Sequence, residues 1–287
     1  MRSRLALAFA LLPGLLSAQE RVAVKGRIVN ERGEAVEYVQ LGVPKLQLGT
    51  ISTADGRFEM EVPCDTLEFF HVSYQPAVFP VTGPADNVVI VLHEQELAPA
   101  VFIGGDTKEK YLLRPGANVL KNMGVISTAL RSEHPSGREL GSVARAKKPF
   151  LVKDILLSVR SNHIPGCVAS INIYRIEGKN ESFVNVLRRP IYFDVAVSND
   201  PQVFDIQPEE SILLEPGSYF IAFQIVGYDE QALKDYLAKP EEERKHWEMT
   251  MDFSIFMKSS YIREIALGEM QHFPVNIGVA VKGLEYQ

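Results

Sequence analysis

His93 and Glu96, in the run His-Glu-Gln-Glu, have the spacing that most suggests a metal site. A histidine and a glutamate separated by two residues supply nitrogen and oxygen ligands that zinc accepts. The pair closes a strand-like apolar run, and positions three apart on an extended strand point to opposite faces. We therefore predict an exposed strand end here, with no metal site and no cofactor.

Nucleophilic catalysis has no clear support in the sequence. The chain lacks a Gly-x-Ser-x-Gly motif, and neither Cys64 nor Cys167 lies in a recognisable catalytic context. The run Ile-Pro-Gly after His163 marks a loop tip, where a surface imidazole is the simpler interpretation. Acidic residues such as Glu209 and Glu210 are neighbours in sequence, whereas a glycosidase needs two carboxylates facing each other across a cleft. We predict that the protein is not an enzyme, and a hydrolase is the least favoured function.

Aromatic side chains could instead form a platform for a ligand, because a ring offers a large apolar face together with a polar edge. Trp247 follows the charged run Glu-Glu-Glu-Arg-Lys-His and could be exposed there, although a single tryptophan is also a common core residue. A platform on the C-terminal half would suit a carbohydrate. The candidate platform residues are Trp247, Tyr219, Tyr228 and Tyr261.

Net charge and cysteine content further limit the classes of partner and the covalent links that we expect. The 287 residues include 30 Lys and Arg against 36 Asp and Glu, a formal net charge of -6. Binding to nucleic acid is driven by clustered cations, and the basic stretches at 145–149 and 188–189 are short and separated. We predict no nucleic-acid partner. Two independent buried thiols are expected at Cys64 and Cys167, with a disulfide between them as the alternative.

The N-terminus has the layout of a secretory signal. Two arginines precede an apolar run from Leu5 to Leu16, and small residues up to Ala18 follow it. We predict cleavage after Ala18; a membrane anchor is the alternative. No later segment has 18 consecutive apolar residues, so no transmembrane segment is expected after signal cleavage. The predicted location is periplasmic, outer-membrane-associated or secreted.

Residues 19–95 alternate short strand-like runs with turn signals, a pattern typical of a small antiparallel β-sandwich of seven strands. In the stretch GTISTADGRFEM, residues 49–60, the pair Asp55-Gly56 predicts the turn of a hairpin. After it, Phe58 and Met60 alternate with charged residues, as in a strand buried on one face.

This half resembles the carboxypeptidase-regulatory-like domain, a transthyretin-like (prealbumin-like) sandwich of secreted and outer-membrane proteins of Bacteroidetes-type bacteria. The resemblance covers about 75 residues of the sequence. It implies a fold and no activity, because this domain is a non-catalytic appendage even in the enzymes that give it its name. The residues that match the family motif are Gly26, Gly33, Gly49, Thr50, Asp55, Gly56 and Phe58.

Residues 96–135 mix charge with Gly and Pro, and we predict a connector there. From 136 to 287 strand-like runs resume, and eight or nine of them indicate a larger, jelly-roll-like β-sandwich. One amphipathic stretch, with Leu233 and Leu237 in its apolar stripe, predicts a short helix that ends by Pro240. Four stretches carry a further resemblance: GRELGSVARAKKPFLVKDILLSV, INIYRIEGK, VLRRPIYFDV and ILLEPGSYFIAFQIVG. By these stretches the half resembles the C-terminal domain that follows a regulatory-like domain in uncharacterised Bacteroidetes proteins.

The sequence as a whole predicts an all-β, two-domain, non-enzymatic protein with a structural or interaction role at the cell envelope. The predicted partner is an unknown envelope protein or a glycan. The alternative is a carbohydrate-binding protein that uses the aromatic residues of its C-terminal sandwich.

Overall fold

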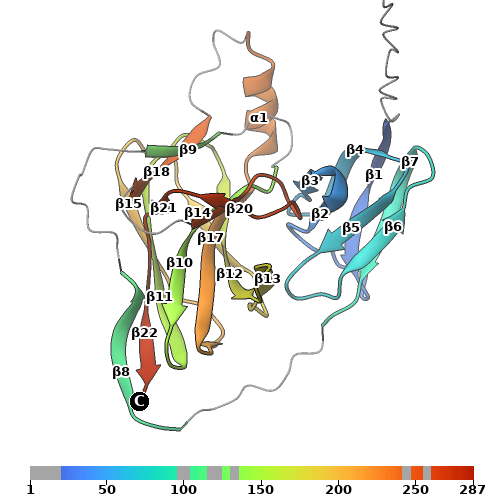
Figure 1. The fold of residues 1–287 in the computed structure, drawn as a ribbon. Helices are drawn as coiled ribbons and strands as arrows, with labels where there is room; N and C mark the ends of the chain where they lie inside the picture. The colour runs from blue at the N-terminus through green and yellow to red at the C-terminus, as the bar shows by residue number, and fades with distance from the viewer. Residues whose placement is uncertain (1–20, 96–103, 115–124, 130–135, 241–246, 255–259) are drawn as a thin grey trace, which may run out of the picture.

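A computed structural model describes residues 21–95, 104–114, 125–129, 136–240, 247–254 and 260–287. In these ranges the regular structure is almost entirely β-strand, and α1 (Glu230–Leu237) is the one α-helix (Figure 1). The predicted all-β class is confirmed. No helix in the described ranges is long and apolar enough to cross a membrane. The predicted signal peptide, residues 1–18, lies outside the described residues.

The N-terminal sandwich consists of two small sheets around one apolar core. One sheet has the strand order β4-β1-β7 and the other has the order β3-β2-β5-β6. All seven strand-like runs of the sequence form strands. Their bounds are β1 (Arg21–Asn30), β2 (Gln40–Val43), β3 (Leu48–Ile51), β4 (Arg57–Pro63), β5 (Thr66–Phe70), β6 (Ala77–Pro80) and β7 (Ala85–Leu92), with a short 3₁₀ turn η1 (Pro44–Leu46).

The turn at Asp55-Gly56 forms as expected, but it does not close a hairpin. Gly56 adopts φ +77°, and Thr53 Oγ1 accepts a hydrogen bond of 2.9 Å from the backbone N of Arg57. The strands on either side belong to different sheets, because β3 pairs with β2 and β4 pairs with β1. The prediction of a hairpin is therefore wrong: a local turn signal does not say which strands pair beyond it.

One pairing also departs from the expected antiparallel arrangement. Strand β7 runs parallel to β1, and their register shifts between Val24 and Gly26. Asn87, at φ +57°, lies on β7 opposite this shift. A Cβ on Gly26 would collide with the carbonyl of Val88, so the first motif glycine permits the close approach of the two strands.

Alternation along the strands produces the N-terminal core. On β4, Phe58 and Val62 are buried whereas Arg57 and Glu59 are exposed. The ring of Phe58 meets that of Phe69 edge-on, with centroids 5.5 Å apart. The strand period of two thus places the motif phenylalanine in the core, as the sequence predicts.

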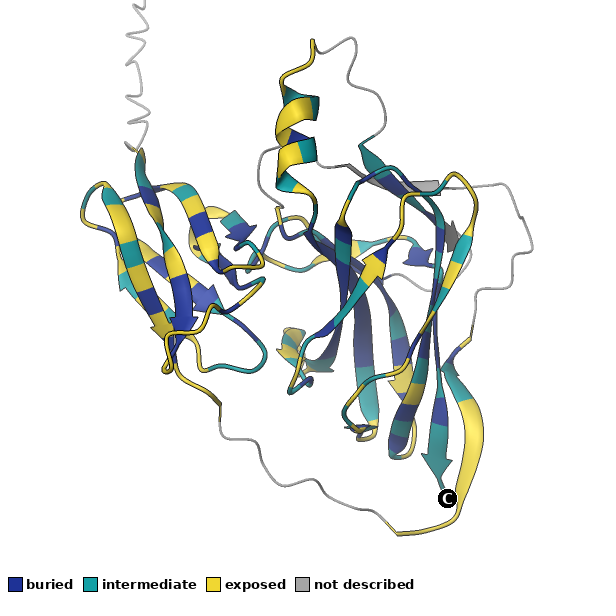
Figure 2. Cartoon of the chain, turned by 180° about the vertical axis from the view of Figure 1, so that it is seen from behind, coloured by how far each residue is buried: buried dark blue, intermediate teal, exposed yellow. Residues whose placement is uncertain are grey.

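The C-terminal sandwich has two larger sheets that face each other across a second core (Figures 1 and 2). The first sheet has seven strands: β10 (Glu139–Ala146), β12 (Cys167–Glu177), β13 (Ser182–Asn185), β14 (Ile191–Val195), β17 (Gly217–Gly227), β19 (Ser260–Arg263) and β20 (Gln271–Phe273). The second has eight strands: β8 (Thr107–Leu113), β9 (Val125–Ala129), β11 (Phe150–Asn162), β15 (Gln202–Ile206), β16 (Ile212–Leu214), β18 (Glu248–Ser254), β21 (Asn276–Ile277) and β22 (Val279–Tyr286).

Two of these strands lie in the segment that the sequence predicts to be a connector. Strand β8 pairs with β22, and β9 pairs with β18, so residues 96–135 contribute to the second sandwich. Most of β8 is exposed and charged, and ion pairs such as Lys110–Glu285 at 2.7 Å join it to its neighbour. An edge strand of this kind has no alternating apolar pattern, which is why the prediction missed it.

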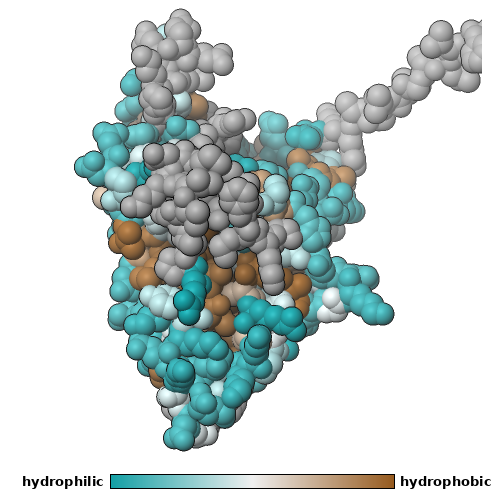
Figure 3. Space-filling view, turned by 60° about the vertical axis from the view of Figure 1, so that its left-hand side comes forward, coloured by the Kyte–Doolittle hydropathy of each residue, from teal (hydrophilic) through white to brown (hydrophobic). Residues whose placement is uncertain are grey.

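The outer face of the eight-stranded sheet carries apolar side chains outside the core. Leu151 on β11 pairs with Leu213 on β16 and with Leu284 on β22, and all three are half-buried. Figure 3 shows hydrophobic residues gathered midway along one flank of the C-terminal sandwich, with hydrophilic residues below them.

Candidate binding cleft between the two sandwiches

A cleft of about 760 Å³ lies where the N-terminal sandwich meets the end of β17 and helix α1. Its volume falls in the range of about 300–1,000 Å³ that is usual for small-molecule sites, which often form between domains. Both sandwiches contribute walls. Lining residues include Lys25, Arg57 and Glu59 on one side and Val226, Tyr228 and Leu233 on the other.

The N-terminal wall is the outer face of the β4-β1-β7 sheet. Lys25 Nζ and Glu59 Oε1 form an ion pair of 2.6 Å across β1 and β4, with both side chains about half exposed at 47% and 49%. The hydrogen bond and the charge of Glu59 raise the pKa of Lys25. Arg27 Nε donates to the carbonyl of Asp55 at 3.1 Å. This wall therefore presents charges of both signs that already have partners.

The C-terminal wall is largely apolar. Helix α1 begins at its N-cap Asp229, whose side chain accepts a hydrogen bond of 2.9 Å from Ala232 N, and it buries Leu233. The predicted helix and its apolar stripe are thus present, and the helix ends before Pro240. Val226, 3% exposed at the end of β17, lines the same wall.

Direct contacts hold the two walls together. The rings of Tyr38 and Tyr192 meet edge-on with centroids 5.1 Å apart, and they pack on a small apolar cluster that includes Ile51 and Val226. A Cβ on the motif residue Gly49 would collide with the carbonyl of Ala266. The contact between the two sandwiches therefore requires a glycine at this position.

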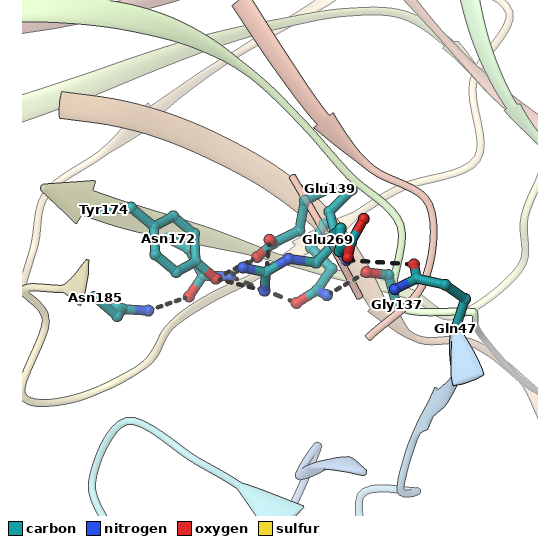
Figure 4. A network of polar contacts seen from close by, with 9 residues as sticks. Gln47, Gly137, Glu139, Asn172, Tyr174, Asn185 and Glu269 are labelled. Carbon is teal, nitrogen blue, oxygen red and sulfur yellow. Dashed lines mark hydrogen bonds and ion pairs between the residues drawn. The ribbon is translucent and has the colours of Figure 1, made fainter. Parts of the chain in front are cut away.

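A polar network is buried on the outer face of the seven-stranded sheet (Figure 4). Glu139 is fully buried, and its Oε1 accepts hydrogen bonds from Tyr174 Oη at 2.7 Å and from Asn172 Nδ2 at 2.8 Å. Its Oε2 lies 3.2 Å from Arg263 Nη1. Burial lowers the pKa of Arg263, but the charge of Glu139 and the contact with Tyr174 raise it overall. The carboxylate is thus held by neighbouring side chains, an arrangement that fixes structure.

The same network reaches the N-terminal sandwich. Gln224 Nε2 donates to the carbonyl of Gly137 at 2.8 Å, and Gln47 Oε1 accepts from Glu269 N at 3.3 Å (Figure 4). Because Gln47 precedes β3, the polar groups on this face run up to the boundary between the sandwiches.

The four predicted platform residues do not lie on one exposed surface. Tyr219 is 1% exposed, faces the core from β17, and donates its hydroxyl to the carbonyl of Glu215 at 2.7 Å. Tyr261 is 8% exposed and packs edge-on against Phe183 at 4.8 Å. The expectation of exposed rings is corrected for these two tyrosines, because both rings face covered sides of the seven-stranded sheet.

The other two platform residues are half-buried in different places. Tyr228 lines the cleft between the sandwiches. Trp247 packs against the C-terminal core and lies 5.0 Å from the ring of Tyr236 on α1. Tyr38, which the sequence analysis did not single out, is the second tyrosine of the cleft.

The remaining motif residues of the N-terminal half serve the fold. Gly33 adopts φ +78° in the turn after β1, and Thr50 is buried on β3. Asp55 lies in the turn before β4, where its side chain pairs with Arg57 Nε at 2.7 Å. No metal-binding group of three His, Cys, Asp or Glu side chains occurs in the described ranges.

The structure also shows the surroundings of the residues considered for catalysis or for a disulfide. His93 Nδ1 lies 2.8 Å from Glu31 Oε1 on the surface, while Glu96 falls outside the described residues. Cys64 and Cys167 are both free thiols. Burial raises the pKa of Cys167 to about 12, whereas Cys64 is exposed. The prediction of two buried thiols is therefore wrong for Cys64, which follows the last residue of β4 into a turn.

Comparison with known proteins gives weak likenesses. No family model and no curated protein matches the chain. A clostridial cysteine protease after propeptide cleavage is similar with a TM-score of 0.36 and 10% identity, over 83% of this chain and 52% of that one. The chain thus spans about half the length of that protease.

Two further solved structures come from Bacteroides-type bacteria. A DUF3823 family protein from Parabacteroides merdae has a TM-score of 0.21 and 9% identity, over 93% of this chain and 98% of that one. A Bacteroides uniformis protein, provisionally described as carbohydrate binding, has a TM-score of 0.22 and 12% identity, over 66% and 80%. At these TM-scores the likenesses assign neither a ligand nor an activity to this chain.

Proposed function

We propose that the protein is a non-enzymatic binding protein of the cell envelope, exported by its N-terminal signal and holding a ligand or partner segment in the cleft between its sandwiches. The observation that carries the proposal is the cleft itself, about 760 Å³ in volume and walled by both sandwiches. Its largely apolar C-terminal wall and its N-terminal wall with charges of both signs suit an amphipathic ligand. Lys25 and Glu59 form an ion pair with each other. A binding surface tolerates such a pair, whereas acid–base catalysis has no need of one.

The N-terminal half is proposed to be a carboxypeptidase-regulatory-like domain. The seven-stranded sandwich supports this assignment, and so do the motif glycines at Gly26 and Gly56, which occupy positions with close strand approach and a positive φ. Such a domain supplies a scaffold, and function belongs to sites built on it.

A glycan is the second candidate ligand, and the rings of Tyr38 and Tyr228 in the cleft favour it. The site would then lie at the boundary between the sandwiches rather than on the C-terminal half alone. Tyrosine rings present an apolar face and a polar hydroxyl, which suits a sugar ring.

The test is binding of the purified protein to a glycan array and to a panel of envelope polysaccharides and proteins, with three forms of the chain. We expect the wild type to retain at least one ligand, Tyr228→Ala to lose it, and Trp247→Ala to keep it because Trp247 lies outside the cleft. A ligand that binds both variants as well as the wild type would place the site elsewhere. Turnover of a bound polymer would show that the protein is an enzyme.

A further inference from the structure

A second cavity, of about 430 Å³, lies on another part of the boundary between the sandwiches. The segment before β2, the chain after β5 and the turn before β14 form its walls. It shares one lining residue, Ala54, with the larger cleft. Its lining includes Glu37, Glu94, His71, Arg188 and Arg189.

Four charged side chains line this cavity, and two of them are neutralised by residues outside it. Glu94 Oε1 lies 3.3 Å from Arg32 Nη2, and Arg189 Nε lies 2.8 Å from Glu210 Oε1. Among the described residues, no ion pair joins Glu37 or Arg188 to any opposite charge, or the two to each other. Glu37 is exposed and Arg188 is half-buried, so the cavity lining presents to solvent one carboxylate and one guanidinium that lack a salt-bridge partner.

The imidazole in the cavity adds no charge. His71 Nδ1 accepts a hydrogen bond of 3.2 Å from Ser73 N, which leaves the proton on Nε2, 3.4 Å from Tyr192 Oη. Burial lowers the pKa of His71 to about 4, so the ring is neutral near pH 7. Ser73 Oγ donates to the carbonyl of Arg188 at 3.1 Å and so ties the arginine's turn to the N-terminal sandwich.

We propose that this cavity binds a small zwitterion, a free amino acid or short peptide, with its carboxylate on Arg188 and its ammonium group on Glu37. A guanidinium can bind a carboxylate through two parallel hydrogen bonds, and a carboxylate accepts from an ammonium group. A ligand with a single charge would engage only one of these two groups, whereas a zwitterion engages both. The site is separate from the proposed cleft ligand and does not depend on it.

The test is calorimetric titration of the purified protein with L-alanine, dialanine and trialanine, each also in an N-acetylated and a C-amidated form. We expect at least one free zwitterion to bind, and either blocking group to weaken it about tenfold, the loss of one charge-assisted contact. In Arg188→Gln, amidation should no longer matter; in Glu37→Gln, acetylation should no longer matter.

Matched controls come from the same cavity. Arg189→Gln and Glu94→Gln remove equal charges that already have partners outside it, and both should bind like the wild type. The proposal is overturned when none of the three zwitterions binds, when blocking a terminus has no effect, or when the control substitutions weaken binding as much as Arg188→Gln and Glu37→Gln. Tyr228→Ala, which tests the cleft, should leave zwitterion binding unchanged, so the two sites fail independently.

Discussion

In the N-terminal sandwich the outer face of the β4-β1-β7 sheet carries charged side chains in contact with solvent, whereas the outer face of the seven-stranded C-terminal sheet is covered. On β4, Arg57 and Glu59 are exposed. On β17, Phe220 and Ala222 point away from the main core and are nevertheless 0% and 1% exposed. One sandwich thus has a single core, and the other has an apolar core on one side of its sheet and a mixed aromatic and polar layer on the other.

The covered face explains why polar groups are satisfied so differently in the two regions. A buried charge is tolerated when other groups pair with it, and Glu139 meets three such groups. The exposed pair Lys25–Glu59 needs no such support, because water solvates both groups. Disrupting a pair should therefore lower the unfolding free energy strongly on the covered face and only slightly on the exposed one.

The largest expected effect is the loss of Arg263. Arg263→Ala leaves the Glu139 carboxylate buried without its cation, and such a change typically costs about 3–5 kcal/mol of unfolding free energy. Arg175→Ala is the control on the same sheet, because Arg175 pairs with Glu177 at the surface, and it should cost less than about 1 kcal/mol. Urea denaturation of both variants measures the difference, and equal losses would mean that the network contributes no more than a surface pair.

The next effect is a pH dependence at the boundary between the regions. Burial disfavours the imidazolium, and in the folded state it lowers the pKa of His71 from its ordinary value of 6.5 to about 4. As pH falls, the unfolded chain binds the proton first. The stability that the neutral, buried ring of His71 contributes is therefore fully present above pH 6.5 and is lost as pH falls towards 4. By the linkage relation, this difference in pKa corresponds to about 3 kcal/mol of unfolding free energy.

Denaturation midpoints at pH 7.5 and pH 4.5 should show this loss for the wild type. His71→Gln should flatten that part of the dependence, since glutamine does not titrate in this range. His272→Gln, at an exposed site, should leave it intact. A pH profile unchanged by His71→Gln would show that the imidazole is not buried at the boundary.

A smaller effect is expected from packing between the sandwiches. Gly49→Ala places a methyl group against the carbonyl of Ala266, and overpacking of this kind costs about 1–3 kcal/mol. Gly83→Ala adds the same methyl where nothing lies within 4 Å, so it should change stability little. Limited proteolysis should also cut between the sandwiches faster in Gly49→Ala. The same rate in both variants would mean that the contact is not tight.

The two regions also differ in how far the sequence predicts them. On β4 the alternation of Phe58 with charged neighbours reveals both the strand and its buried face. On β17 every residue from Tyr219 to Gly227 is buried, and the run is apolar on both faces, so the sequence shows the strand but does not distinguish its two faces. For that reason the sequence could not show that Tyr219 points into the core, and it suggested an exposed ring.

The cleft and the second cavity lay beyond prediction for a different reason. Their residues are far apart in sequence: Glu37 and Arg188 come from different sandwiches, as do Arg57 and Leu233. Strand periodicity fixes which way each side chain points, but it says nothing about which surfaces of two domains meet. Tyr228 was a candidate platform residue because of its type alone, and Tyr38, which lines the same cleft, was missed because no pattern linked the two.

The smallest expected effect concerns the exposed wall of the cleft. Lys25→Ala removes one partner of the Lys25–Glu59 pair, and because both side chains are about half exposed at 47% and 49%, the unfolding free energy should fall only slightly. If these charges serve a ligand, Lys25→Ala should change cleft binding more than it changes stability. Titration of the cleft ligand beside urea denaturation separates the two quantities. A loss of stability as large as that of Gly49→Ala, with binding unchanged, would make this wall part of the scaffold. The contrast between an exposed binding face and a covered supporting face would then no longer hold.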